Sequence, residues 1–253
     1  MLKKVLITGG SGLIGTHLIN SLDVAEFNVF TLARTPGKFS RPVTHLDVDL
    51  SKEWDTGQLP AEVDYVIHLA QSENFRLFPE RASEVFFVNT VSTLKLADYA
   101  RTAGVKNFIY ASSAGIYGNS DSGFSEEQDI VYKNDLGFYL ASKHCSEVIL
   151  DNYSSFMKVA VLRLFFVYGK GQKPDMLIPR LLGFVKNGTP ITLQGEYGIK
   201  INPTYVGDAV DAIKASLLLE SSQKINVAGP DILSLREIGN LIGKVVNRTA
   251  VFD

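Results

Sequence analysis

The chain has 253 residues, which suits one large domain or a domain with a small additional lobe. Hydrophobic residues make up 45% and charged residues 21%, which excludes a disordered or fibrous protein, and the net charge of −2 gives no electrostatic basis for binding nucleic acid or an anionic membrane. Cys145, the single cysteine, excludes an internal disulfide and is typical of a reducing compartment, so we expect a cytoplasmic protein.

No segment predicts a membrane anchor. Residues 1–4 resemble the start of a signal peptide, but Gly9, Gly10 and Gly12 interrupt the apolar run that follows. The most apolar later run, residues 159–168, contains Arg163 and is shorter than the roughly 20 residues that a spanning helix needs.

Short β-branched runs alternate with segments of helical periodicity, which predicts parallel βαβ units. The predicted strands are 5–8, 28–32, 43–47, 63–70, 106–112, 159–164 and 225–227. The predicted helices are 13–22, 82–103, 139–153, 206–219 and a last one that opens with a capping box, Ser234 as N-cap and Glu237 at N3. Nearly continuous apolar strands indicate a doubly wound parallel sheet of the α/β class, covered on both faces.

After Gly169 the pattern of alternating strands and helices changes, because prolines at 174, 179, 190 and 203 divide the chain into short elements. We therefore expect residues 1–168 and about 204–228 to form a dinucleotide-binding domain. Residues 169–203 and 229–253 are expected to form a small lobe over the carboxyl edge of its sheet.

The segment Thr8 to Gly15 ends a predicted strand and opens a helix, the context in which a glycine pattern indicates dinucleotide binding. Small residues let the backbone approach a pyrophosphate, and the helix N-terminus supplies N–H donors and positive potential. The predicted contacts are Gly9, Ser11, Gly12, Leu13, Ile14 and Gly15.

The end of the second predicted strand bears on the choice of cofactor. An NAD site usually has an acid there, but this chain has Ala33 followed by Arg34, which suits a 2′-phosphate and favours NADP, unless Arg34 only faces solvent. Asp49 and Leu50 are expected to frame the adenine. Asp47 with Asp49 is too small a set to predict a metal, so no metal site is expected.

Tyr139 is the only one of ten tyrosines with a lysine four residues later, Lys143. In a helix both side chains then share a face, and the ammonium would lower the pKa of the phenol towards working pH. Ser112 ends the preceding predicted strand, and Ser113 follows it directly. Together with the glycine turn, this set indicates proton and hydride transfer with a nicotinamide cofactor.

These residues resemble the extended short-chain dehydrogenase/reductase family, in its sugar-nucleotide epimerase/dehydratase group. The resemblance covers Lys4 to about Val246. It is carried by 8–15, 64–70, Asn89, 108–118, Tyr139 with Lys143, Arg163, 168–169 and 205–208.

The resemblance implies a Rossmann domain with a small C-terminal substrate lobe. It implies that Tyr139 is the acid/base, that Lys143 grips the nicotinamide ribose and that Ser113 hydrogen-bonds the reacting oxygen. It also implies a homodimer formed through the helices from Ala82 and Tyr139. The further residues that it places at the cofactor are Leu69, Ala70, Gln71 and Asn89, and those at the substrate are Phe166 and Lys200, beside Ser113 and Tyr139.

The chain also departs from the family pattern. Dehydratases of this group carry an Asp-Glu pair where Ala114 and Gly115 follow Ser113, so we expect no sugar dehydration. Phe166 stands where uridine-sugar enzymes often have Asn, and Ile201, beside Lys200, stands where many have a phosphate-binding Arg. Family members usually run some tens of residues longer, so the C-terminal lobe is expected to be shortened or incompletely represented.

The predicted function is therefore an NAD(P)-dependent epimerase of a nucleotide-activated sugar. The alternative is an NADPH-dependent 4-ketosugar reductase, which Arg34 favours. A nucleotide-sensing regulator without catalysis would not need the intact Ser113, Tyr139 and Lys143. Among the remaining residues, His68 is expected to be a core histidine, Cys145 to pack off the active face, and residues 121–129 to form a solvated loop.

Overall fold

The computed structural model describes residues 1–118, 123–130 and 136–253. They form two compact units, Met1–Leu164 with Ala209–Val227, and Phe165–Asp208 with Ala228–Asp253. Each unit has a hydrophobic core of its own. Within the described ranges, no helix is both long enough and apolar enough to cross a membrane.

The first unit is built on a seven-stranded sheet in the order β10-β6-β5-β4-β1-β2-β3, with every neighbouring pair parallel. The order reverses beside β1, which is the arrangement of a Rossmann-like doubly wound sheet and confirms the predicted fold class. The strands are β1 (Lys3–Thr8), β2 (Phe27–Ala33), β3 (Thr44–Asp47), β4 (Tyr65–His68), β5 (Asn107–Ser113), β6 (Lys158–Leu164) and β10 (Gln223–Val227).

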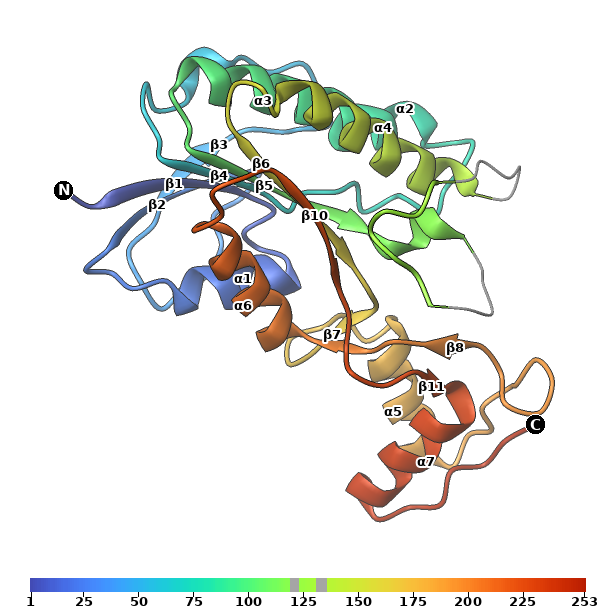
Figure 1. The fold of residues 1–253 in the computed structure, drawn as a ribbon. Coiled ribbons are helices and arrows are strands. Elements are labelled where there is room, and N and C mark those ends of the chain that lie inside the picture. The colour runs from blue at the N-terminus through green and yellow to red at the C-terminus, as the bar shows by residue number, and fades with distance from the viewer. Residues whose placement is uncertain (119–122, 131–135) are drawn as a thin grey trace. The chain divides into compact units, whose positions relative to one another are not determined.

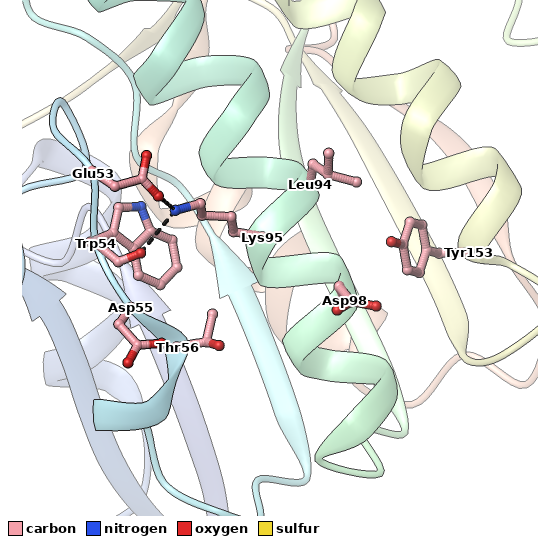
Figure 2. A pocket seen from close by; sticks show the side chains of 8 residues that line it. All are labelled: Glu53, Trp54, Asp55, Thr56, Leu94, Lys95, Asp98 and Tyr153. Carbon is pink, nitrogen blue, oxygen red and sulfur yellow. Dashed lines mark hydrogen bonds and ion pairs between the residues drawn. The ribbon is translucent and has the colours of Figure 1, made fainter.

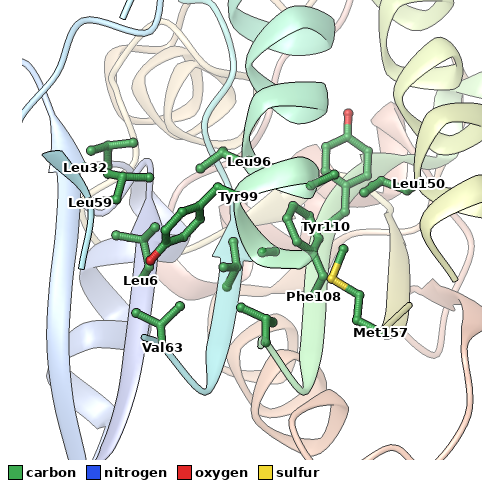
Figure 3. Close-up of a cluster of buried hydrophobic side chains, with 14 of the residues drawn as sticks. Leu6, Leu32, Leu59, Val63, Leu96, Tyr99, Phe108, Tyr110, Leu150 and Met157 are labelled. Carbon is green, nitrogen blue, oxygen red and sulfur yellow. The ribbon is translucent and has the colours of Figure 1, made fainter. Parts of the chain in front are cut away.

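Helices cover both faces of this sheet (Figure 1). One face carries α3 (Ser92–Thr102) and α4 (Gly137–Tyr153), and the other carries α1 (Leu13–Ser21) and the part of α6 (Val206–Ser216) that belongs to this unit. Under α3 and α4, apolar side chains of the helices interlock with those of the strands (Figure 3). This cluster includes Leu6, Leu32, Leu59, Leu96, Tyr99, Phe108, Tyr110, Leu150 and Met157, all buried.

The predicted helix 82–103 is continuous but not uniform. It begins as α2 (Ala82–Phe86), widens into one π-helical turn at Phe87–Val91 and continues as α3. In that turn the backbone oxygen of Asn89 accepts hydrogen bonds from the Thr93 and Ser146 hydroxyls. Hydrophobic periodicity does not register one wider turn, because the apolar stripe continues across it, and such turns are frequent at functional sites.

Two short 3₁₀ helices complete this unit, Thr56–Gln58 and Ala114–Tyr117. The predicted strand 63–70 ends at His68, because Leu69 and Ala70 turn towards the end of β1, where Thr8 accepts hydrogen bonds from both of their backbone N–H groups.

The second unit packs α5 (Leu177–Asn187) against α7 (Leu235–Val246). Its core consists of Leu181, Val185, Ile191, Ile201 and Ile238. Two small sheets accompany the helices, β7 (Val167–Tyr168) with β9 (Thr204–Tyr205), and β8 (Lys200–Ile201) with β11 (Leu233–Ser234). The predicted capping box is confirmed, since the Ser234 hydroxyl accepts from the Glu237 N–H while the Glu237 carboxylate accepts from the Ser234 N–H.

Candidate active site

The glycine turn after β1 is tight because its glycines leave no room for side chains. Gly9 has φ +68°, and a Cβ there would lie 2.7 Å from the Ala70 nitrogen. A Cβ on Gly15 would lie 2.3 Å from the Gly9 carbonyl oxygen, so the first turn of α1 lies directly against the loop. The turn is closed by a hydrogen bond of 3.0 Å from Gly12 N–H to that same oxygen.

The N-terminus of α1 is open to a ligand. Gly12 is the N-cap and has no side chain to satisfy the first N–H groups, and Ser11 and Gly12 are exposed. The helix begins at Leu13, and Leu13 and Ile14 are half-buried. An uncapped helix start behind a glycine turn fits a dinucleotide pyrophosphate, because the unpaired N–H groups and the helix dipole both attract anions.

Arg34, directly after β2, is exposed and makes a 3.4 Å contact with the Glu73 carboxylate. Asp49, further along the edge, is partly satisfied by its own loop, since its carboxylate accepts from the Ser51 N–H and hydroxyl. Burial alone would raise the pKa of Asp49, but hydrogen bonds from Ser51 and Lys52 outweigh it and hold the pKa below its ordinary value. The Leu50 side chain is buried in the core cluster.

The end of β4 contains a buried histidine. His68 lies between two hydroxyls, with Nδ1 2.6 Å from Thr8 Oγ1 and Nε2 3.0 Å from Thr93 Oγ1. Burial, with a smaller contribution from the positive charge of Lys143, lowers the pKa of His68 to about 3. The prediction of a satisfied core histidine is confirmed.

Asn89 ties this edge to helix α4. It is fully buried; its side-chain oxygen accepts from the Ser72 N–H at 3.0 Å, and its amide donates to the Ser142 hydroxyl at 2.9 Å. Both ends of the amide are therefore used to hold the loop after β4 against the helix that carries Tyr139. Its contribution to the site is to position those two segments.

Tyr139 stands in the first turn of α4, half-buried, with its hydroxyl donating to the side-chain oxygen of Gln71 at 2.9 Å. Its ring lies 4.9 Å from that of Phe75. A hydrogen bond with Ser113, at the end of β5, also acts on the phenol. The structure thus brings together Ser113, Tyr139 and Gln71, three of the predicted site residues.

Lys143 is one turn further along α4 and is 1% exposed. Its ammonium donates to the Ala111 carbonyl at 2.7 Å and lies 4.9 Å from the centre of the Tyr110 ring. Burial lowers the pKa of Lys143 from 10.5 to about 7. The nearby Glu147 carboxylate has the opposite, smaller effect and raises this pKa.

The protonation of Tyr139 differs from the expectation. Burial raises the pKa of Tyr139 to about 12, and the bond with Ser113 offsets part of this rise, whereas the helical spacing predicted a lowered pKa. The reason is that the Lys143 ammonium donates to Ala111, on β5, and that its own burial disfavours the charge that would stabilise a phenolate.

Phe166 and Lys200 belong to the second unit. Phe166 is exposed and has φ +33°, one of two non-glycine residues with positive φ in the described chain, the other being Asn247. Side chains in that region cost backbone strain, which often marks functional positions. Lys200 is exposed on β8, opposite Ser234.

Sequence reasoning missed a buried ion pair behind Lys143. Arg163 of β6 and Glu147 of α4 are 2% and 0% exposed and form a 2.8 Å contact. Arg163 is a charge within the apolar run 159–168 and one of the positions that carry the resemblance, and an arginine inside an apolar strand is itself a signal for a buried partner. Nothing in the sequence spacing identified Glu147 as that partner.

Two further expectations need correction. Cys145 does not pack, because it lies exposed on α4, two residues beyond Lys143 on another face of the helix. The acidic loop is not simply solvated. Although Asp121 and Ser122 lie outside the described residues, Phe124 stacks on Tyr117, and a Glu126 carboxylate oxygen accepts from the Asn226 N–H at 2.8 Å.

A surface pocket of about 740 Å³ lies elsewhere, on the outer side of α3 (Figure 2). It is lined by Glu53, Trp54, Asp55, Thr56, Leu94, Lys95, Asp98 and Tyr153, none of which belongs to the site above. Lys95 forms part of the pocket wall, where its ammonium donates hydrogen bonds to the Glu53 carboxylate and to the Trp54 carbonyl. In the described part of the chain, no three His, Cys, Asp or Glu side chains are grouped so as to hold a metal.

The parallel sheet, the glycine turn after β1 and the positions of Ser113, Tyr139 and Lys143 have the pattern of the extended short-chain dehydrogenase/reductase class. The model of the NAD-dependent epimerase/dehydratase family matches residues 5–228, and the chain belongs to that family.

Three similar proteins illustrate its range. The dTDP-D-glucose 4,6-dehydratase of Mus musculus is 30% identical over 83% of this chain, which spans 63% of the mouse protein. The structure of MoeE5 in complex with UDP-glucuronic acid and NAD is 27% identical, with a TM-score of 0.85 over 99% of this chain and 84% of the other. The UDP-glucose 4-epimerase of Thermus thermophilus, in complex with NAD, is 27% identical, with a TM-score of 0.81 over 99% and 85%.

Proposed function

We propose that the protein is an NAD(P)-dependent epimerase of a nucleotide-activated sugar. The observation that carries this proposal is the meeting of Tyr139 with Ser113, at the carboxyl edge of the sheet that also carries the glycine turn. The similar structures of MoeE5, in complex with UDP-glucuronic acid and NAD, and of a UDP-glucose 4-epimerase, in complex with NAD, support the same substrate class and cofactor.

The chain's own residues divide the work between binding and proton transfer. The Gly9 to Gly15 turn would hold the pyrophosphate, and Lys143 would hold the nicotinamide ribose. When bound, the nicotinamide accepts and returns a hydride. Tyr139 takes the proton from the sugar hydroxyl as the carbonyl forms and gives it back afterwards, while Ser113 donates a hydrogen bond to that oxygen.

The protonation of Tyr139 sets a condition on this chemistry. With a pKa of about 12, the phenol holds its proton at neutral pH and is ready to act as an acid. For Tyr139 to act as a base, its hydroxyl must leave Gln71 and its pKa must fall, which a positive charge beside the phenol would promote.

The direct test uses the purified protein and a panel of UDP- and dTDP-sugars, with products separated by chromatography and the bound cofactor identified by mass spectrometry. An epimerase interconverts two sugars of equal mass and leaves the absorbance of added NAD(P)H unchanged. Tyr139→Phe should lower turnover by about three orders of magnitude or more while leaving cofactor affinity nearly unchanged. A near-normal rate in that variant contradicts the proposed role.

The second candidate is an NADPH-dependent 4-ketosugar reductase, and Arg34 is the observation that favours it. Arg34 is exposed at the end of β2, where Ala33 leaves no carboxylate for a ribose 2′-hydroxyl. A charge-assisted bond to a 2′-phosphate is worth about 1.5–3 kcal/mol, so NADP(H) should bind roughly tenfold or more tightly than NAD(H).

Titration of both cofactors against the wild type, Arg34→Ala and Glu73→Ala decides the cofactor. Arg34→Ala should remove the preference for NADP(H), whereas Glu73→Ala frees the guanidinium and should increase it. Equal affinity of the wild type for both cofactors would mean that Arg34 only faces solvent. This result would favour the epimerase hypothesis over the reductase hypothesis. A reductase consumes NADPH in equal amount to its 4-ketosugar substrate.

We propose that the enzyme does not dehydrate its sugar, although the mouse relative is named a dehydratase. Ala114 and Gly115 follow Ser113 and carry no acidic group that could drive the loss of water. A product lighter by one water, formed from a plain 6-hydroxy sugar nucleotide, would overturn this part of the proposal.

A further inference from the structure

Three charged side chains are buried together behind Tyr139. Lys143, Glu147 and Arg163 are 1%, 0% and 2% exposed. Burying a charge is costly unless a partner compensates it. The charge states in this region therefore depend on how the single carboxylate of Glu147 compensates both Lys143 and Arg163.

Glu147 makes contacts to the sheet with both carboxylate oxygens. Arg163 Nη2 donates to Oε2 at 2.8 Å, and Arg163 Nε lies 3.3 Å from each oxygen. The Ser112 hydroxyl of β5 donates to Oε1. The carboxylate is therefore held by side chains of both β5 and β6.

Lys143 lies one turn before Glu147 on α4, a spacing that puts the two side chains on one face. Its ammonium donates to Ala111, and Ser112, the next residue of β5, donates to Glu147. Lysine and glutamate are thus bound to adjacent residues of one strand, and the carboxylate is the acidic group that opposes the effect of burial on the pKa of Lys143.

The titratable and charged groups around this pair come from β4, β5, β6 and α4 itself. Lys143 faces the Tyr110 ring of β5, and its charge acts on His68 of β4. Glu147 faces Arg163, Ser112, Tyr110 and His144. Among these, His68 stays neutral above about pH 3, which leaves Arg163 as the permanent cation beside the carboxylate.

Arg163 extends the network to the loop before α4. Its other terminal nitrogen donates to the Tyr117 hydroxyl at 2.6 Å and to the Glu126 carbonyl at 3.3 Å. The Tyr117 hydroxyl donates in turn to Asn226 at 2.9 Å, and the Asn226 N–H donates to the Glu126 carboxylate. The same arginine thus holds Glu147 and the described end of the loop.

We propose that Glu147 is a positioning residue for catalysis, the buried counter-ion that favours the ammonium form of Lys143 near neutral pH. This inference rests on the proposed role of Lys143 at the cofactor. Arg163 fixes the carboxylate in the place from which it acts. The consequence is that loss of the carboxylate changes the charge of Lys143 even where the fold is kept.

The test measures that charge directly in the cofactor-free protein. Lysine is labelled with ¹³C, and the Cε resonance that Lys143→Arg removes is followed from pH 5 to 11. The wild-type midpoint is expected near 7, and Glu147→Gln should move it down by about one pH unit or more. Glu147→Asp keeps the charge and should give a midpoint between these two values.

Asp151→Asn is the matched control, because it removes an exposed carboxylate one turn further along α4, where Asp151 pairs with Lys224. It should leave the Lys143 midpoint unchanged. Since Glu147→Gln leaves Arg163 unpaired in the core, Glu147→Gln is also made in an Arg163→Gln background. There the midpoint must again fall relative to Arg163→Gln alone.

Two outcomes overturn the proposal: a Lys143 midpoint that is the same in Glu147→Gln as in the wild type, or no fall in the Arg163→Gln background. A purely structural role would lower the thermal midpoint of unfolding and leave the titration in place. The titration needs no substrate, so its result stands even where no sugar nucleotide is turned over. With an active enzyme, the alkaline limb of the kcat/KM profile should move to lower pH in Glu147→Gln and return towards the wild type in Glu147→Asp.

Discussion

The edge of the parallel sheet carries two regions built on opposite principles. At the end of β1 the site is made of backbone, with glycines at positions where a Cβ would meet neighbouring backbone atoms. At the ends of β5 and β6 it is made of side chains, with three buried charges that must satisfy one another. We expect the first region to be disrupted when a side-chain atom is added, and the second to be destabilised when a charge is removed. Each region is therefore tested by a different kind of substitution.

The largest effect is expected at the glycine turn. Gly15→Ala places a Cβ 2.3 Å from the Gly9 carbonyl oxygen. This oxygen belongs to the backbone, so it cannot move aside as the end of a flexible side chain could. We expect cofactor affinity to fall by about a hundredfold or more, and stability by roughly 2–4 kcal/mol. Calorimetric titration with NAD(P)H and urea unfolding measure the two quantities.

Gly104→Ala is the matched control for Gly15→Ala. Gly104 has φ +69°, but a Cβ added there would meet no atom within 4 Å, so only backbone strain of about 1 kcal/mol is expected, with cofactor affinity unchanged. If both variants bound cofactor alike, the turn at Gly15 would not be the pyrophosphate site.

The buried lysine gives the next largest effect, on stability as a function of pH. Because the pKa of Lys143 is about 7 in the folded state and 10.5 in the unfolded state, the unfolded chain binds more protons between these values. Stability should therefore rise with pH across this window, by up to about 1.4 kcal/mol per pH unit. Lys143→Met should lack that rise.

Urea unfolding of the wild type and Lys143→Met at several pH values from 7 to 9.5 measures the difference. A slope that is the same in both proteins would show that Lys143 keeps an ordinary pKa in the fold. In that case Glu147 would compensate fully for its burial.

His68 allows a test at acid pH, because this buried side chain is neutral rather than charged in the folded protein. Its pKa is about 3 in the fold against 6.5 in the unfolded chain, so stability is lost as the pH falls below 6.5. Between pH 6.5 and 5 this loss should amount to roughly 2 kcal/mol. His68→Gln keeps an amide donor and acceptor between Thr8 and Thr93 but cannot titrate, and it should show a correspondingly flatter dependence. An equally steep dependence in the variant would place the acid sensitivity elsewhere.

The same comparison explains how far sequence reasoning reached. The tight turn from Gly9 to Gly15 was predictable, because its requirements lie within one short stretch of backbone, and so was the placement of Tyr139 and Lys143 one turn apart on a helix. The pairing of Glu147 with Arg163 was not predictable, because it joins a helix to a strand through packing that no local pattern contains. The π-helical turn at Asn89 was missed because the apolar stripe continues across it, and the exposure of Cys145 was missed because a lone cysteine inside a helix carries no local signal of its burial.

The smallest expected effect lies in the second unit, at the helix start that the sequence predicted from residues only three positions apart. Ser234→Ala removes the hydroxyl that accepts from the Glu237 N–H and should destabilise the protein by about 1 kcal/mol. Ser155→Ala is the control, because Ser155 is exposed and its hydroxyl makes only a long bond of 3.4 Å to Asn152, so it should cost little. Urea unfolding measures both variants, and NAD(P)H titration should give wild-type affinity for both. Equal stability of the two variants would mean that the Glu237 side chain, which accepts from the Ser234 N–H, suffices to start α7 without the hydroxyl.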